Sequence, residues 1–174
     1  MKEVISQLVN KHMTRSPFEL ADALGIIVLY EPLGSINGYY NTAFRQKFIH
    51  INNELPEYKR KFTAAHELGH AILHPKSNTP FLKEKTYLSV NKMEIEANRF
   101  AVNLLITDEE LEEYKELTIN EIANIYGLQE ELIQLRLISL LGGGGCKVGS
   151  MWVQDKLTNI EPFQVPLLQR FYDN

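Results

Sequence analysis

The sequence predicts an α+β domain in which a small mixed β-sheet packs on several helices. Short apolar runs bounded by glycine and proline lie between residues 26 and 51, and longer segments with helical periodicity follow them. The chain of 174 residues is 44% hydrophobic and 23% charged, which suits one globular domain with a sizeable core. We expect this domain to span residues 1–141, followed by a glycine-rich joint and an apolar tail over residues 142–174.

The first two helices are predicted from their ends. Met1–Arg15 has the pattern of an amphipathic helix. Ser16 and Pro17, followed by Glu19, predict a second helix with an N-cap serine, a proline in the first helical position and a capping-box glutamate. Gly25 predicts the end of that helix, because glycine readily adopts the left-handed conformation found after a helix C-terminus.

Strands are expected after this helix. Ile26–Tyr30 is a short apolar run followed by turn residues. Ile36–Tyr40 and Lys47–Ile51 flank a loop and predict a β-pair. A small mixed sheet is therefore expected ahead of the first long helix.

The most informative stretch is His66–His70, which has the pattern HExxH inside a predicted helix. The segment Arg60–His74 contains no proline, and Pro56 and Pro75 bracket it. Apolar residues recur in it at spacings of three to four, which predicts a buried stripe beside the histidines. Gly69 costs roughly 1 kcal/mol relative to alanine inside a helix, so we expect it to pack closely against another backbone.

The HExxH pattern indicates metal-assisted hydrolysis. Histidines four residues apart lie on one face of a helix, with roughly 5–6 Å between their Cβ atoms, so His66 and His70 can bind one metal ion. Glu67 can then take a proton from a water at that metal, as amide hydrolysis requires. A surface helix that carries two histidines by chance is the alternative, but the helical context favours a metallopeptidase.

A metal held by two histidines needs a third protein ligand and one position left for water. His74 continues the row of histidines, but it lies about 12 Å from His66 along the helix axis, so the three cannot bind one ion. We expect His74 to be a helix-end residue, where a partly cationic imidazole suits the last carbonyl groups.

The third ligand is expected in a second helix, Asn91–Leu105. Glu94 and Glu96 both qualify by residue type. Glu94 shares its face with small residues that suit packing against another helix, whereas Glu96 points about 200° away and is expected to be solvated. We therefore predict that Glu94 is the ligand, and that Asn98, one turn further on, orients a ligand histidine by a hydrogen bond.

The segments FTAAHELGHAILH and MEIEANRFAVNLL resemble the ImmA/IrrE family of bacterial and phage-borne metalloproteins, a gluzincin-like peptidase group. The resemblance covers residues 16–141, more weakly outside these two segments. It implies a zincin-like metallopeptidase fold with His66, His70 and Glu94 as metal ligands and Glu67 as general base.

The resemblance also guides the interpretation of the strands and of one departure. The family usually follows its second helix with Leu-Met-Pro, whereas here Leu105 is followed by Ile106, which we interpret as a loop variation. In zincin-like enzymes an edge strand above the metal commonly receives the peptide substrate, and we expect one strand of the β-pair to do so. Tyr39 and Tyr40 are possible donors to the oxyanion, although aromatic residues at a sheet edge are the favoured interpretation of both.

Carried over to this chain, the resemblance implies an endopeptidase whose protein substrate is a helix-turn-helix transcriptional repressor of a mobile element, prophage or stress response. Histidine and carboxylate ligands suit zinc best, with manganese as the alternative. Two other classes are open: a metal-containing regulatory module that binds a repressor or DNA without proteolysis, and a binding platform with a structural metal. The intact Glu67 disfavours the first, and the lack of a fourth histidine or cysteine at a plausible spacing disfavours the second.

Thr118–Leu137 has the pattern of a helix-turn-helix, with Ala123 and Gly127 where its corner needs small residues. Between Asp108 and Glu131, however, there are nine acidic side chains and one lysine, which a phosphate backbone would repel. We therefore expect a structural corner and no nucleic-acid partner.

The single cysteine, Cys146, excludes an internal disulfide and fits a reducing compartment. The chain has neither a signal-peptide pattern nor an apolar run of about eighteen residues, so we expect a cytoplasmic protein without a membrane partner. The net charge of −4 gives no reason to expect nucleic-acid binding. The tail is too apolar to be a free solvated segment, and we expect it to pack on the domain or to engage a partner. Our hypothesis is that it covers part of the substrate groove or the sheet edge. The oligomeric state is not predicted.

Overall fold

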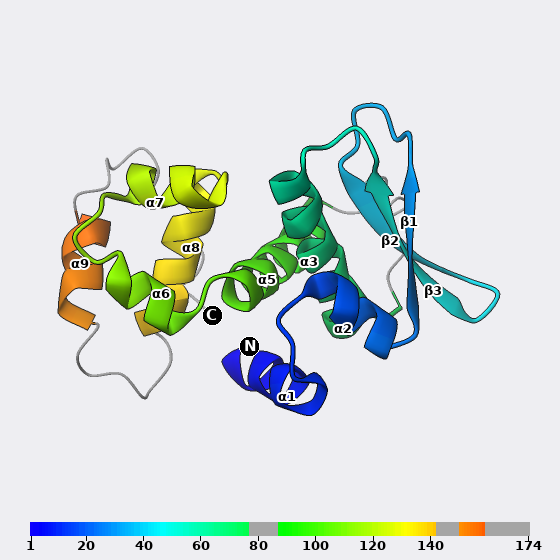
Figure 1. Cartoon of the computed structure of the whole chain (residues 1–174), viewed down its shortest axis with the longest axis horizontal. Coiled ribbons are helices and arrows are strands. Elements are labelled where there is room, and N and C mark those ends of the chain that lie inside the picture. The colour runs from blue at the N-terminus through cyan, green and yellow to red at the C-terminus, as the bar shows by residue number, and fades with distance from the viewer. Residues whose placement is uncertain (77–86, 142–149, 159–174) are drawn as a thin grey trace.

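The computed structural model describes residues 1–76, 87–141 and 150–158. The N-terminal part contains α1 (Lys2–His12), α2 (Pro17–Ala23), β1 (Ile26–Glu31), β2 (Gly38–Ala43) and β3 (Gln46–Asn52). After it come α3 (Glu57–Leu73), α5 (Tyr87–Leu105), α6 (Asp108–Glu113), α7 (Ile119–Tyr126), α8 (Glu130–Leu141) and α9 (Ser150–Thr158). The sheet lies at one end of the molecule and α6–α9 gather at the other, with α5 running between them (Figure 1). The predicted α+β class is confirmed.

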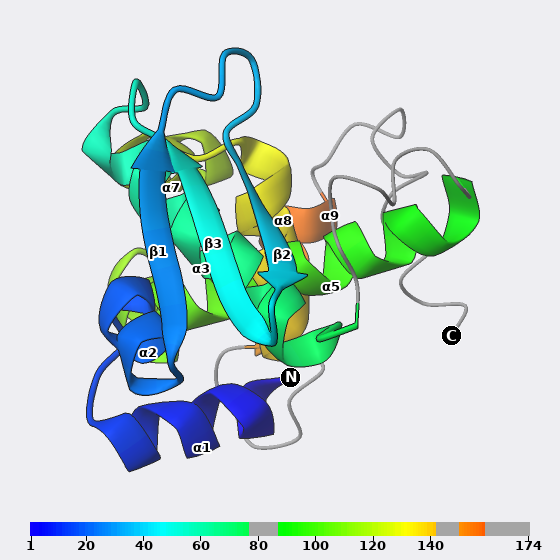
Figure 2. The same cartoon turned by 90° about the vertical axis from the view of Figure 1, so that its right-hand side faces the viewer.

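The strands form one mixed sheet in the order β1–β3–β2. β1 is parallel to β3, and β2 is antiparallel to it with Tyr40 opposite Ile49. The strands predicted from the sequence are confirmed, although β2 begins two residues later than expected, at Gly38. Because side chains alternate along a strand, Ile49 and Ile51 face the helices and His50 faces the other way. Helices α3 and α5 lie behind the sheet and α1 lies below it, with β1 and β2 at the two borders of the sheet (Figure 2).

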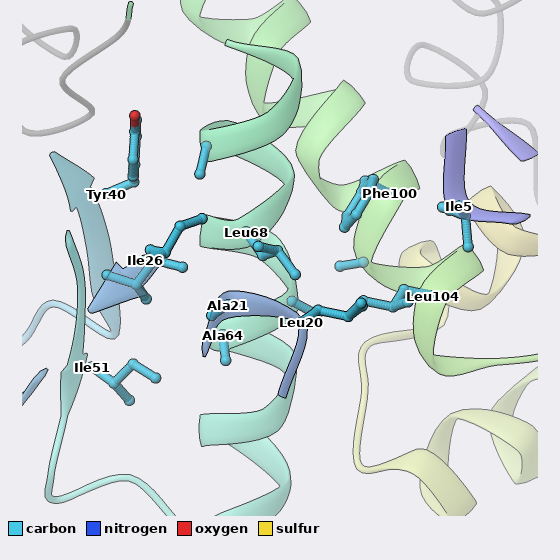
Figure 3. Packing of buried hydrophobic residues seen from close by; sticks show 14 residues of the cluster. Ile5, Leu20, Ala21, Ile26, Tyr40, Ile51, Ala64, Leu68, Phe100 and Leu104 are labelled. Atoms are coloured by element: carbon cyan, nitrogen blue, oxygen red, sulfur yellow. The ribbon is translucent and has the colours of Figure 1, made fainter. Parts of the chain in front are cut away.

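Helix α3 packs between the sheet and α5. Its Leu68 is fully buried, with Ile26 and Ile51 of the sheet on one side and Phe100 and Leu104 of α5 on the other (Figure 3). Burying side chains of this size stabilises the fold by about 1.5–3 kcal/mol each. The buried stripe predicted for this helix is therefore confirmed, and it holds the HExxH segment between the sheet and α5.

The start of α2 is predicted correctly in part. The hydroxyl of Ser16 accepts a hydrogen bond from the Glu19 N–H, and Pro17 is the first helical residue. The capping box is wrong, because the Glu19 carboxylate accepts from the Thr14 hydroxyl instead. The helix ends before Gly25, whose φ of 66° is in the left-handed region, as expected.

Helices α6–α9 enclose a second apolar cluster, to which Leu111, Ile122 and Val153 belong. In α9, Val153 is fully buried and the indole of Trp152 donates to Glu112 at 3.1 Å. The glycine-rich joint with its cysteine (142–149) and the segment 159–174 lie outside the described residues. Of the predicted tail, α9 packs in the second apolar cluster and not on the sheet, so the hypothesis that the tail covers the substrate groove or the sheet edge now concerns only the segment 159–174.

The corner between α7 and α8 is made at Gly127, which has a φ of 63°. Residues 133–137 of α8 are buried without interruption. A recognition helix must present an exposed face to the major groove of DNA, and α8 has little exposed surface to offer. This burial agrees with a structural corner.

None of the described helices is both long and apolar enough to cross a membrane.

Two arginines hold the C-terminal carbonyl groups of α5. The last carbonyls of a helix have no partner within it and carry partial negative charge, so guanidinium groups satisfy both their hydrogen bonding and their charge. The contacts join Arg15 to Asn103 O (3.2 Å) and Leu104 O (2.8 Å), and Arg136 Nε to Ile106 O (2.8 Å). These contacts fix helix α5 at its C-terminal end, which is the end farther from Glu94, the predicted metal ligand.

Gly69 faces α5 as expected. A Cβ atom at this position would lie 3.1 Å from the Cβ of Phe100 and 3.2 Å from both Cα and O of Ala97. The absence of a side chain therefore lets the two helix backbones approach closely.

We predict that Arg136→Met lowers the free energy of unfolding by about 1–3 kcal/mol, because it leaves the buried carbonyl of Ile106 without its donor, whereas the lost ion pair with the half-exposed Asp108 adds little. Lys2→Met is the matched control, since Lys2 binds the same carboxylate at an exposed site and should cost at most about 1 kcal/mol. Urea denaturation of both variants checks this. Equal losses would show that Arg136 acts only as a surface partner of Asp108.

We further predict that Gly69→Ala destabilises the protein by about 1 kcal/mol and Gly69→Val by more. The added atoms press on the backbone of α5, and this overpacking exceeds the gain in helix propensity. Thermal and urea unfolding of the series measure the order. An alanine variant more stable than the wild type would refute the close contact.

Candidate metal centre

Three side chains from α3 and α5 converge. The Nε2 atom of His66 lies 3.2 Å from Oε2 of Glu94, and the Nε2 atom of His70 lies 3.4 Å from its Oε1. The two Nε2 atoms are 3.1 Å apart. One ligand atom from each of the three residues lies within 4.8 Å of the others. Among the described residues, this is the cluster of histidines and carboxylates that is compact enough to hold a metal ion.

The position of the proton on the His66 imidazole makes this cluster suited to bind a cation. The Oδ1 atom of Asn98 lies 2.8 Å from Nδ1 of His66. An amide oxygen can only accept, so Nδ1 carries the proton and Nε2 of the neutral ring turns a lone pair toward Glu94 and His70. Lone pairs of all three side chains can thus meet at one point, which needs a positive charge between them. A divalent metal ion with nitrogen and oxygen ligands fits this donor set.

The cluster also shifts the pKa values of its members. Burial alone would raise the pKa of Glu94, but the interactions of its carboxylate with both imidazoles outweigh burial and hold this pKa well below its usual value. Burial lowers the pKa of His66, whereas its contacts with Glu94 and the charge of Glu67 raise it by more. The pKa of His70 is lowered, chiefly by burial. Glu94 is therefore ionised at neutral pH, as a metal ligand must be.

Glu67 follows His66 on α3 and is buried, with 5% of its surface exposed. Its charge lies close enough to His66 to raise the pKa of that imidazole. A carboxylate in this position can exchange a proton with a water at the cluster.

Glu96 and His74 form a separate pair beside the cluster. The Nε2 atom of His74 lies 3.0 Å from Oε2 of Glu96, whose side chain is 35% exposed. The expectation that Glu96 is solvated is therefore wrong: it turns back to α3. His74 does occupy the helix end, where its N–H donates to the carbonyl of His70, but its imidazole contacts a carboxylate rather than the last carbonyl groups.

The tyrosines proposed for the oxyanion are engaged elsewhere. Tyr40 is fully buried, and its hydroxyl lies 3.2 Å from the carbonyl oxygen of Pro75. The ring of Tyr39 stacks on His50 at 4.1 Å between centroids, and its hydroxyl lies 3.4 Å from Glu31. Burial, followed by the charge of Glu31, raises the pKa of Tyr39. The interpretation of both as strand aromatics is the one that fits these contacts.

Strand β2 runs alongside the HExxH segment. At its start, a Cβ atom on Gly38 would lie 2.5 Å from the methyl group of Thr63. Near the other end of β2, its neighbour on β3, Lys47, donates a hydrogen bond to the carbonyl of Ala71 at 3.1 Å. The HExxH segment lies between these contacts along α3. The second edge of β2 forms a border of the sheet, on the side where α5 begins (Figure 2). Of the two strands considered for substrate, β2 has the better placement.

A polar cluster across the sheet was not anticipated from the sequence. Nδ1 of His50 lies 2.6 Å from Oε1 of Glu31, and Tyr39 covers the imidazole. Alternation along β3 indicates that His50 faces away from Ile49 and Ile51. Its partners depend on how three strands align, and local sequence does not specify that register.

Comparison with known proteins agrees with this geometry. Residues 21–137 match the model of a peptidase family described as the IrrE N-terminal-like domain (peptidase M78). "Uncharacterized immunity region protein 2" of Bacillus phage phi105 is 44% identical over 144 residues, which are 81% of this chain and 91% of that protein. "Metallopeptidase ImmA" of Bacillus subtilis (strain 168) is 34% identical over 115 residues, which are 65% of this chain and 67% of that protein.

The matched segment contains both long helices and the three converging side chains. In this segment the small mixed sheet and the helices packed on it form a zincin-like metallopeptidase domain. This chain therefore belongs to the ImmA/IrrE family of metallopeptidases.

Proposed function

We propose that this chain is an endopeptidase in which His66, His70 and Glu94 hold one divalent metal ion and Glu67 is the general base. The observation that carries the proposal is the convergence of the three ligand atoms within 4.8 Å. Three protein ligands leave a position for water, as in catalytic rather than closed structural sites. Membership of the family supports a metal-dependent protease in general.

The residues have distinct roles in this proposal. A bound divalent metal would supply a Lewis acid that lowers the pKa of a water and polarises the substrate carbonyl. Glu67 takes the proton of the attacking water on its carboxylate and delivers it to the leaving amine nitrogen. Asn98 accepts from Nδ1 of His66 and so fixes the ring with Nε2 toward the other ligands. The outer edge of β2, a border of the sheet in the described part of the chain, can pair with the main chain of an extended substrate.

We propose zinc as the metal, because two imidazoles and one carboxylate form the ligand set it favours, with manganese as the alternative.

We propose that the substrate is a helix-turn-helix repressor. The family resemblance implies this class, and the immunity-region name of the phage relative agrees with control of a mobile element. The regulatory alternative, binding without proteolysis, gains nothing from a buried carboxylate at Glu67, and the buried face of α8 disfavours DNA as a partner.

Elemental analysis of protein purified without added metal tests the ligand set. We expect about one equivalent of metal in the wild type, lost in Glu94→Ala and retained in Glu96→Ala, since Glu96 contacts His74 and not the cluster. The two substitutions remove the same atoms two residues apart, so each controls for the other. Metal lost only from Glu96→Ala would overturn the assignment of Glu94. No uptake by any sample, including on titration with zinc or manganese, would overturn the metal-dependent endopeptidase.

Glu67→Gln should retain metal and thermal stability while its cleavage rate falls about 10²–10⁴-fold, because glutamine cannot accept the proton. Mass spectrometry of products from purified helix-turn-helix repressors of the source genome measures cleavage. Wild-type turnover by this variant would refute the role of Glu67. Metal-loaded wild type that leaves every repressor intact but hydrolyses other peptides would refute only the substrate class.

A further inference from the structure

The turn between β2 and β3 has an unfavourable backbone for its residues. Ala43 pairs with Gln46, so Phe44 and Arg45 form a two-residue turn, and their φ angles are 51° and 65°. Turns of this kind, with positive φ at both central residues, strongly favour asparagine and glycine. A bulky side chain in the left-handed region is strained, and such strain persists where other requirements outweigh it.

The same turn exposes an aromatic ring. Phe44 is fully exposed (101%), whereas the other phenylalanines of the described ranges are buried or half-buried. Arg45 beside it is also exposed. In Figure 1 the turn projects from the sheet at the right-hand edge of the molecule. Among the residues that the structure describes, none buries the ring of Phe44.

The turn lies at the end of the strand that best fits an extended substrate. Phe44 follows Tyr40 by four residues, roughly 13 Å along an extended strand. A protein whose cleaved segment pairs with β2 would therefore bring its neighbouring folded part to this turn. Pairing with a strand edge uses main-chain groups and selects little for sequence, so recognition of one protein needs additional side-chain contacts.

We propose that Phe44 and Arg45 form a docking element for the folded part of the protein substrate, an inference that rests on the proposed function. Aromatic and arginine side chains are the types that most often dominate protein interfaces. The pair suits an apolar pocket for the ring, bordered by an acidic side chain that pairs with the guanidinium. The strain in the turn is then retained because Asn-Gly would lack both contacts.

The test replaces the pair by the residues that the turn prefers. Phe44→Asn/Arg45→Gly should raise Tm by about 2–6 °C, because it relieves left-handed strain. It should lower kcat/KM for the repressor cleaved by the wild type at least about tenfold, mainly through KM, and leave unchanged the cleavage of a synthetic peptide spanning the same bond. Phe44→Asn alone separates the ring from the guanidinium.

Met13→Gly is the matched control. Met13 is 86% exposed and also has a positive φ, 56°, but it lies after α1. Its replacement should raise Tm without changing cleavage of either substrate.

The outcomes separate this inference from the proposed function. Equal cleavage of the repressor by the double variant and the wild type would overturn the docking role alone. Parallel losses on repressor and peptide would also overturn it, because the turn would then be shaping the β2 edge. A wild type that hydrolyses other peptides but no repressor would overturn the proposed substrate and the docking element with it.

Discussion

The close contact of α3 with α5 at Gly69 and Ala97 is the constraint on which the candidate metal centre depends. Gly69 directly precedes His70, and Ala97 lies three residues after Glu94, so the contact and the cluster are neighbours on both helices. The close approach of the backbones at this point brings the carboxylate oxygens within 3.2 and 3.4 Å of the two imidazoles. The sheet on the far side of α3 presses the helix into this position through Leu68.

The cluster joins folding to the binding of a cation. Holding the carboxylate of Glu94 against two largely buried imidazoles, with lone pairs directed at one point, is unfavourable unless a positive charge accompanies them. An ion that binds the folded chain and not the unfolded chain therefore adds its binding free energy to stability. The hydrogen bond from His66 to Asn98 prepares the site in advance, because it selects the tautomer before an ion arrives.

The sequence predicted what depends on helical and strand periodicity. The spacing of His66 and His70 and the face that carries Glu94 follow from 3.6 residues per turn, and these side chains meet in the structure. The sequence did not predict which of several available partners a side chain would choose. The carboxylate of Glu96, for example, contacts the imidazole of His74. The turn at Phe44 was missed for another reason, since it contains neither of the residues by which such turns are recognised.

The two arginines anchor α5 through its main-chain carbonyl oxygens, and this has an evolutionary consequence. Asn103, Leu104 and Ile106 contribute main-chain atoms to this anchoring, so it does not depend on their residue types. Arg15 and Arg136 have no such freedom, although they come from opposite ends of the domain. A lineage that shortened the chain at either end would lose one guanidinium, and the position of the ligand helix would then have to be fixed by a new cation from elsewhere.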